Sequence, residues 1–200
     1  MSTLKTTNLR HESSSSNNIV LDSTGKVTVA EKKFVCPGTV IQVQSITKTD
    51  TATSGSIGRI SDGVYWDYTD SSLKLSITPT ATSSKILVTG QVNIGSDRTN
   101  ITCIFQLMRD GSAIGGGSSP GSRTPVHSQT SYWSNTAEIL DFPIHFLDSP
   151  STTSAVEYNA RIAHSSSTNT IFYINRSHPD TNDYSYTRTV STITAMEIAG

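Results

Sequence analysis

Two neighbouring stretches of alternating apolar and polar residues constrain the fold of this chain most. In the stretch from Lys85 to Gly95 every second residue is apolar or glycine, and Leu87 is an apolar exception on the otherwise polar face. The stretch from Ile101 to Gly115 begins with the same alternation. A period of two is typical of a half-buried β-strand. We therefore predict that both stretches are central strands of one antiparallel sheet.

A tight turn is predicted at Asp110-Gly111, inside the second stretch. A two-residue hairpin turn requires positive φ at both central residues, and glycine adopts positive φ without steric cost. The pattern therefore predicts a hairpin at this point.

Further strands are predicted along the rest of the chain. They lie at Val40–Ile46, Val64–Tyr68, Leu73–Ile77, Leu140–Phe146, Val156–Ile162, Thr170–Ser177 and Val190–Ile198. Pro143 inside one of them predicts an edge strand or a bulge, because proline cannot donate to a strand ladder. About eight strands with turn signals between them, and no helical periodicity, predict an all-β fold: an antiparallel β-sandwich of the jelly-roll type.

The N-terminal part has a different composition. Residues 1–18 carry few apolar side chains, so alone they should be disordered and should gain order only on a partner. The next residues predict a small hairpin, with arms at Ile19–Leu21 and Lys26–Val29. Because an isolated hairpin is marginal in water, we expect it to pack against a second copy or another protein. The turn Cys36-Pro37-Gly38 predicts a border, with an arm at 1–37 and a sandwich at 38–200.

Charge and composition narrow the function class. The chain has 15 basic and 16 acidic residues, which disfavours a nucleic-acid binder with a basic stripe. Only 16% of residues are charged, against about 25% in an average domain, whereas Ser and Thr make up about 30%. Such a surface suits permanent contact between chains, and equally suits a threonine-rich β-protein that makes no such contact.

Targeting and redox signals are sparse. The two cysteines do not predict a disulfide framework, and we expect Cys103 to be a buried, inert thiol. No stretch has the length and apolarity of a membrane span, and the N-terminus lacks the apolar core of a signal peptide. We therefore expect a chain made in the cytosol that does not insert into a membrane.

No catalytic, cofactor-binding or metal-binding motif is apparent. The glycine run at Gly115–Ser119 lacks the lysine of a phosphate-binding loop. The five histidines have no metal-ligand spacing, and we expect them to face solvent. We accordingly predict no enzyme activity, no cofactor and no metal.

Several aromatic residues are candidates for contact with a receptor. Aromatic rings near carboxylates can stack on sugars, but they can equally serve as core and rim of a sandwich. The candidates are Tyr65, Trp66, Tyr68, Tyr132, Trp133, Tyr184 and Tyr186. The loops expected to present such contacts are Thr49–Gly63, Gly115–Pro125 and His178–Tyr186.

An ordered set of motifs carries a resemblance to a known family. The motifs MSTLKTTNL, NIVLDSTGKVTV and GTVIQVQSITKTDT open the chain, and LKLSITPTATSSKILV, FQLMRDGSAIG, FLDSPSTTSAVEYNARI, NRSHPDT and RTVSTITAMEIA follow. Together they resemble the small tail-fibre or appendage proteins of tailed bacteriophages, especially phages of cyanobacteria and marine bacteria. The resemblance covers nearly the whole chain.

This resemblance implies a homotrimeric virion protein made in the host cytoplasm. Its body would be similar in outline to the complement-type globular head and the tumour necrosis factor fold, and its N-terminal arm would dock on other virion proteins. The apolar residues expected to carry docking are Leu4, Leu9, Ile19, Val20, Leu21, Val27 and Val29. The body would face outward and contact a glycan or protein of the host surface. No catalytic residue is implied.

Three alternatives stay open at this point. The first is a capsid decoration, cement or head-fibre protein without a receptor role. The second is a glycan-degrading depolymerase, although the chain is short for a β-helix with a carboxylate-lined groove. The third is a lectin-like module outside any virus.

Overall fold

A computed structural model describes residues 6–17, 19–29, 36–59, 66–67, 73–119, 121–131 and 133–200. The chain divides into two compact units, Met1–Thr39 and Val40–Gly200. The border lies within three residues of the one predicted from the Cys36-Pro37-Gly38 turn. We call the first unit the arm and the second the body.

Every regular element of the described residues is a β-strand. The strands of the arm are β1 (Asn8–Leu9), β2 (Ile19–Leu21) and β3 (Val27–Val29). Those of the body are β4 (Val40–Lys48), β5 (Ala52–Thr53), β6 (Trp66–Asp67), β7 (Leu75–Ile77), β8 (Lys85–Ser96), β9 (Thr102–Arg109), β10 (Ser112–Ile114), β11 (Ser128–Ser131), β12 (Ile139–Asp148), β13 (Val156–His164), β14 (Phe172–Ile174) and β15 (Ser191–Ile198). No helix able to cross a bilayer occurs in the described part of the chain.

The arm is a three-stranded antiparallel sheet with the order β1-β2-β3. The predicted hairpin is confirmed, and its turn is held by Asp22, whose Oδ1 accepts hydrogen bonds from the amides of Thr24 (2.8 Å) and Lys26 (2.9 Å). The prediction of disorder for residues 1–18 is wrong for Asn8 and Leu9. These residues pair with β2, because the free edge of a hairpin offers unpaired backbone groups to any nearby extended segment.

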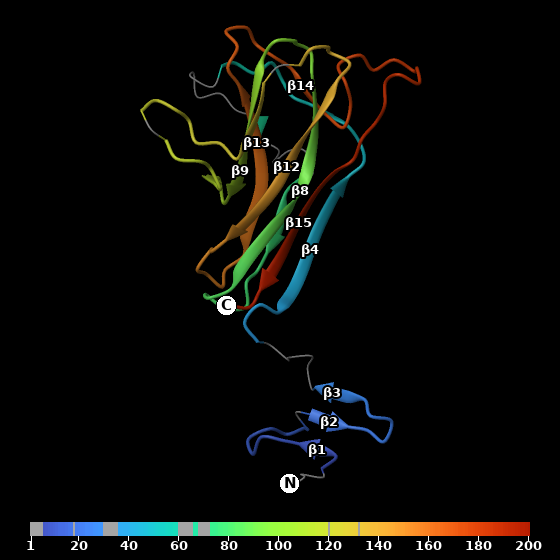
Figure 1. Ribbon diagram of the computed structural model, residues 1–200, viewed down its shortest axis with the longest axis vertical. Helices are drawn as coiled ribbons and strands as arrows, with labels where there is room; N and C mark the ends of the chain where they lie inside the picture. Colours follow the sequence, from blue (N-terminus) through green and yellow to red (C-terminus); the bar gives the residue numbers. More distant parts are fainter. Residues whose placement is uncertain are drawn as a thin grey trace. The chain divides into compact units, whose positions relative to one another are not determined.

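Two antiparallel sheets form the body, so the predicted β-sandwich is confirmed (Figure 1). One sheet, which we call the front sheet, has the order β4-β15-β8-β14-β5, with β12 also paired to β8. The other has the order β10-β9-β13-β6, with β11 paired to β9 and β7 paired to β13. In Figure 1 the front sheet is the brighter layer, nearer the viewer.

The two stretches predicted to share a sheet lie in different sheets. β8 belongs to the front sheet and β9 to the opposite one. The connection between them is no tight turn, and Asn100 adopts a φ of 57° within it. The predicted apolar residues of both strands belong to one core and meet across it instead of lying side by side. The burial of β8 alternates only in its first half, and β9 is buried on both faces from Cys103 to Met108. Alternation fixes which face of a strand is buried, and it does not say which strand is its neighbour.

The core lies between the sheets and takes its side chains from alternating positions, as predicted. In the segment leading into β7, Leu73, Leu75 and Ile77 are all buried. In β13 the buried residues include Tyr158 and Ile162. The thiol of Cys103 is also buried, as predicted, and burial raises its pKa.

Two local predictions are confirmed by the backbone. Asp110 and Gly111 have φ values of 47° and 78°, and they join β9 to β10 as a hairpin. Pro143 lies in β12, whose only strand partner among the described residues is β8, so β12 is an edge strand. About eight strands were expected in the body, and the described residues form twelve, because the structure adds short strands such as β5 and β10.

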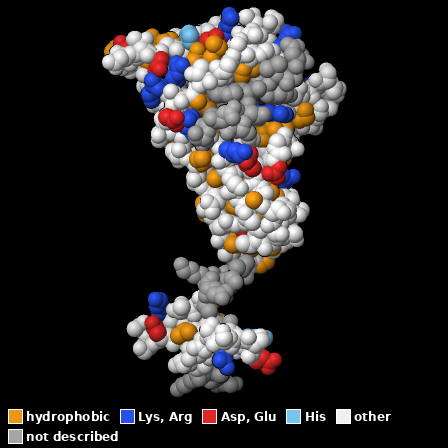
Figure 2. Space-filling view, turned by 180° about the vertical axis from the view of Figure 1, so that it is seen from behind, with side chains coloured by type: hydrophobic (Ala, Val, Ile, Leu, Met, Phe, Trp, Pro, Cys, Tyr) orange, Lys and Arg blue, Asp and Glu red, His pale blue; other side chains and the backbone are white. Residues whose placement is uncertain are grey.

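Neutral side chains dominate much of the surface. In the view of Figure 2, charged side chains are spread over the upper and middle parts of the body, and its lowest part is largely neutral with scattered hydrophobic side chains. This distribution agrees with the low charged fraction of 16%.

Candidate functional site

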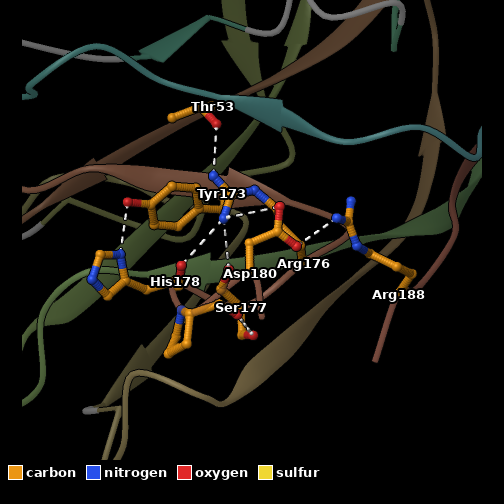
Figure 3. A network of polar contacts seen from close by, with 8 residues as sticks. Thr53, Tyr173, Arg176, Ser177, His178, Asp180 and Arg188 are labelled. Carbon is orange, nitrogen blue, oxygen red and sulfur yellow. Dashed lines mark hydrogen bonds and ion pairs between the residues drawn. The ribbon is translucent and has the colours of Figure 1, made fainter. Parts of the chain in front are cut away.

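One polar cluster of the body is centred on Arg176, just beyond β14 (Figure 3). Its guanidinium lies over the ring of Tyr173, 4.0 Å from the ring centroid. It donates hydrogen bonds to Thr53 Oγ1 (3.1 Å) and to the carbonyl oxygens of Ser177 (3.1 Å) and His178 (3.2 Å). Arg176 therefore ties β5 and β14 to the start of the loop that follows.

A second layer of contacts fixes the loop itself. Asp180 accepts a hydrogen bond from Arg188 Nη2 at 2.5 Å and lies 3.9 Å from Arg176 Nη1. The hydroxyl of Tyr173 is hydrogen-bonded to His178 Nδ1 at 2.9 Å. Two arginines and one carboxylate thus clamp both ends of the segment 178–188 (Figure 3). We call residues 178–188 the clamped loop.

The clamped loop presents one aromatic side chain almost fully to solvent. Tyr184 is 95% exposed. It sits in a turn in which Asp183 Oδ1 accepts a hydrogen bond from the amide of Ser185 (2.8 Å), and the Asp183 carbonyl accepts one from Tyr186 (3.1 Å). The hydrogen bonds from Ser185 lower the pKa of Asp183. A fixed turn that exposes an aromatic ring can stack that ring on a sugar or on an apolar surface of a partner.

Only some of the other receptor-contact candidates lie within the described residues. Tyr65, Tyr68 and Tyr132 lie outside the described residues. Trp66 lies in β6, where its backbone pairs with Ile162 of β13. Tyr186 is half-buried beside Tyr184 in the clamped loop.

Trp133 is a core residue and not a surface contact. None of its surface is exposed, and its ring packs against Phe172 at a centroid distance of 6.1 Å. Its ring belongs to the hydrophobic core cluster of the body. For Trp133 this position agrees with the alternative prediction, that the aromatic residues serve as the core of the sandwich.

Two of the three loops proposed for receptor contact can be compared with the structure in more detail. Within Thr49–Gly63, the part up to Arg59 contributes to the sandwich: β5 pairs with β14, and Ile57 is buried and bridged to Thr170. The described residues of Gly115–Pro125 form no strand and are mostly exposed. The third loop, His178–Tyr186, lies within the clamped loop and is held by the side-chain contacts described above.

The expectation that all histidines face solvent is wrong for His164. This side chain is fully buried, and its Nε2 is hydrogen-bonded to the carbonyl oxygen of Ile57 at 2.7 Å. His127 is half-buried between the rings of Phe105 and Phe146, and burial lowers its pKa. Among the described residues no three His, Cys, Asp or Glu side chains are grouped as a metal site.

The arm carries a second candidate surface. Strand register places Leu9, Ile19 and Val29 in one row across the sheet, and Leu21 and Val27 in the next row on the same face. We call these five residues the aliphatic face of the arm. Of the other predicted docking residues, Val20 lies on the opposite face between Asn8 and Thr28, and Leu4 lies outside the described residues.

Sequence reasoning missed the arginine clamp of the body. The loop at His178–Tyr186 was predicted, but Thr53 is more than one hundred residues away from Arg176 in the chain. No local sequence pattern predicts a contact between two residues so far apart in the chain. The only local signal was the density of charged and polar residues in NRSHPDT.

Fold and surfaces together define an antiparallel β-sandwich with a separate small N-terminal sheet. No protein-family model matches the chain, and no curated protein matches it. Among solved structures, the chain is similar to the VP2 subviral particle of infectious bursal disease virus, with 12% identity over 79% of this chain and a TM-score of 0.42. It is also similar to the Gx strain structure of the same virus, with 13% identity over 90% of this chain and a TM-score of 0.42. The chain spans 38% and 42% of the length of these two proteins.

Proposed function

We propose that this chain is a structural protein of the virion of a tailed bacteriophage. In this proposal three copies assemble, the arm docks on another virion protein, and the body presents its loops to the host surface. Its function is binding, without catalysis. The proposal joins the motif resemblance described above to the surfaces of the arm and of the body.

The aliphatic face of the arm is the observation that carries the docking role. Val27 is 58% exposed, and Leu9 and Leu21 are exposed as well. A three-stranded sheet of such short strands needs a second layer over its apolar face to be stable in water. The arm is a compact unit separate from the body, and a docking partner would supply that layer.

The clamped loop supports contact with the host surface. Its anchoring contacts to Tyr173 and Arg176 reduce the entropy that the loop would lose on binding, and Arg176 is itself held by Thr53. The exposed ring of Tyr184 supplies the apolar face that sugar recognition requires. A host-surface glycan is the ligand that this combination fits best.

Deletion of residues 1–30 tests the docking role. We expect the truncated chain to fold and to be absent from virions purified from cells that express it. Incorporation of the truncated chain at the level of the full chain would refute docking through the arm. Locating the protein on intact particles by electron microscopy then separates a tail appendage from a decoration protein on the capsid.

A further inference from the structure

The outer face of the front sheet carries a continuous apolar row. Strand register aligns Val43 of β4, Met196 of β15, Leu87 of β8 and Leu147 of β12 across the sheet. Leu87 and Met196 point away from the core, because Ile86, Val88 and Ala195 beside them are fully buried. The register puts Val43 and Leu147 on the same face. We call these four residues the outer row.

The outer row is exposed to solvent where it reaches both sides of the sheet. Val43 and Leu147 are each 53% exposed, and Met196 and Leu87 are half-buried between them. Leu87 is the apolar residue that breaks the polar pattern of its strand in the sequence. Its place in the outer row accounts for that exception.

The two rows on the Ser45 side of the outer row are neutral. The next row consists of Ser45, Thr194, Thr89 and His145. The hydroxyls of Ser45 and Thr194 are hydrogen-bonded to each other at 2.8 Å. The row after that consists of Thr47, Thr192, Gln91 and Pro143. Another surface can cover these rows at little cost, because neither carries a carboxylate, a lysine or an arginine that would lose its hydration.

The two edge strands of this face, β12 and β4, differ in how well they are protected against pairing with a foreign strand. β12 carries Pro143 and the charged residue Asp141, which discourage pairing with a foreign strand. β4 has no charged side chain between Val40 and Thr47, and β15 is its only strand partner among the described residues. A long, neutral and uncovered edge is a site of association.

The size and the neutrality of the face indicate that its occupant is another copy of this chain. Four strands about 4.8 Å apart and three rows about 6.7 Å apart give a flat area on the order of 400 Å². This is about half of the roughly 800 Å² that each partner contributes to a standard interface, and the β4 border adds to it. Around a closed symmetry axis each residue lies near its own copies, so a neutral face is compatible with itself, whereas a charged face would repel itself.

We infer that copies of this chain associate through the outer face of the front sheet, with the contact centred on Val43 and the β4 border. The inference rests on the homotrimer in the proposed function and names its interface. The proposed interface does not involve the arm, whose aliphatic face remains available to dock on another virion protein.

The test compares two lysine substitutions in the full-length protein. Val43→Lys places a charge in the outer row, and Ala113→Lys places the same charge on an exposed strand of the opposite sheet. Light scattering after gel filtration should give the wild type and Ala113→Lys a mass of three chains. It should give Val43→Lys a mass about threefold lower, with the same β-sheet circular dichroism. An unchanged mass for Val43→Lys overturns the inference.

A second measurement covers the case in which Val43→Lys fails to fold. A benzophenone amino acid at position 43 should crosslink copies of the purified protein under ultraviolet light, and one at position 113 should not. Equal crosslinking from both positions, or none from either, overturns the inference. A monomeric wild type refutes the homotrimer itself. A trimeric wild type refutes only this interface if Val43→Lys leaves its mass unchanged, or if position 43 does not crosslink more than position 113.

Discussion

Gly90 of β8 lies directly against the carbonyl oxygen of Thr192 in β15. A β-carbon built on Gly90 would be 2.0 Å from that oxygen, and the φ of Gly90 is +153°, a value that side chains rarely allow. The close approach occurs where β15 pairs along β8 in the middle of the front sheet. Glycine at this position is therefore a condition for the pairing of these two strands.

Replacing this glycine should destabilise the body. We expect Gly90→Ala to lower the free energy of unfolding by roughly 3 kcal/mol, because the methyl group forces the two strands apart. Gly55→Ala is the control, since nothing lies within 4 Å of a β-carbon there, and it should change the value by less than about 0.5 kcal/mol. Urea denaturation measures both, and equal effects would contradict the argument.

Glu197 should make stability depend on pH in the acid range. Its carboxylate is buried and accepts hydrogen bonds from Gln42 (2.6 Å), Ser84 (2.7 Å) and both the amide (2.6 Å) and the hydroxyl (2.7 Å) of Thr80. Burial raises the pKa of Glu197, but the hydrogen bonds outweigh it, and the net pKa is lowered.

The sign of the Glu197 effect follows from this lowered pKa. The stabilisation is complete above the pKa of the unfolded carboxyl and is lost as the pH falls through the folded value. We expect Glu197→Gln to cost about 2 kcal/mol at pH 7 and much less at pH 3. Thermal unfolding at both pH values measures the difference, and a cost that is the same at both would contradict the prediction.

His127 should add a separate loss of stability near pH 6. Burial between Phe105 and Phe146 lowers its pKa, so the unfolded chain binds a proton at a higher pH than the folded chain. Stability then falls as the pH drops below the ordinary histidine value of about 6.5. His127→Gln should flatten the dependence of the melting temperature on pH between pH 7 and pH 5, and His11→Gln, at an exposed position of the arm, should not. An unchanged slope in His127→Gln would rule this group out.

A charge on the aliphatic face of the arm should block docking. Val27→Asp places a carboxylate on that face, and Thr28→Asp places one on the opposite face of the same strand. We expect incorporation into virions to fall about tenfold or more for Val27→Asp only, a loss of about 1.4 kcal/mol or more in binding. Quantitative blotting of purified particles measures this, and equal losses would show that the face has no special role.

Removing the exposed ring of the clamped loop should weaken host binding without affecting the fold. Tyr184 is 95% exposed, so Tyr184→Ala should change the free energy of unfolding by less than about 0.5 kcal/mol. Adsorption of the protein to host cells should fall severalfold, and the neighbouring Asn182→Ala serves as control. Full adsorption by Tyr184→Ala would exclude this ring from the receptor contact.

Local sequence patterns predict where the longer strands lie and which of their side chains enter the core, but they miss short strands such as β5 and β10. Leu73, Leu75 and Ile77 follow the predicted alternation, and the Asp110-Gly111 turn has the predicted backbone. These features depend on residues close together in the chain, and a period of two is visible without knowledge of the neighbours.

Which strands lie side by side depends on long-range contacts that the folded structure reveals. It separated β8 from β9 into two sheets, buried Trp133, and brought Thr53 to Arg176. It also aligned Val43 with Met196, Leu87 and Leu147 from four distant strands. Strand pairing depends on contacts far apart in sequence, and alternation is the same whichever strand lies alongside, so no local pattern could reveal these surfaces.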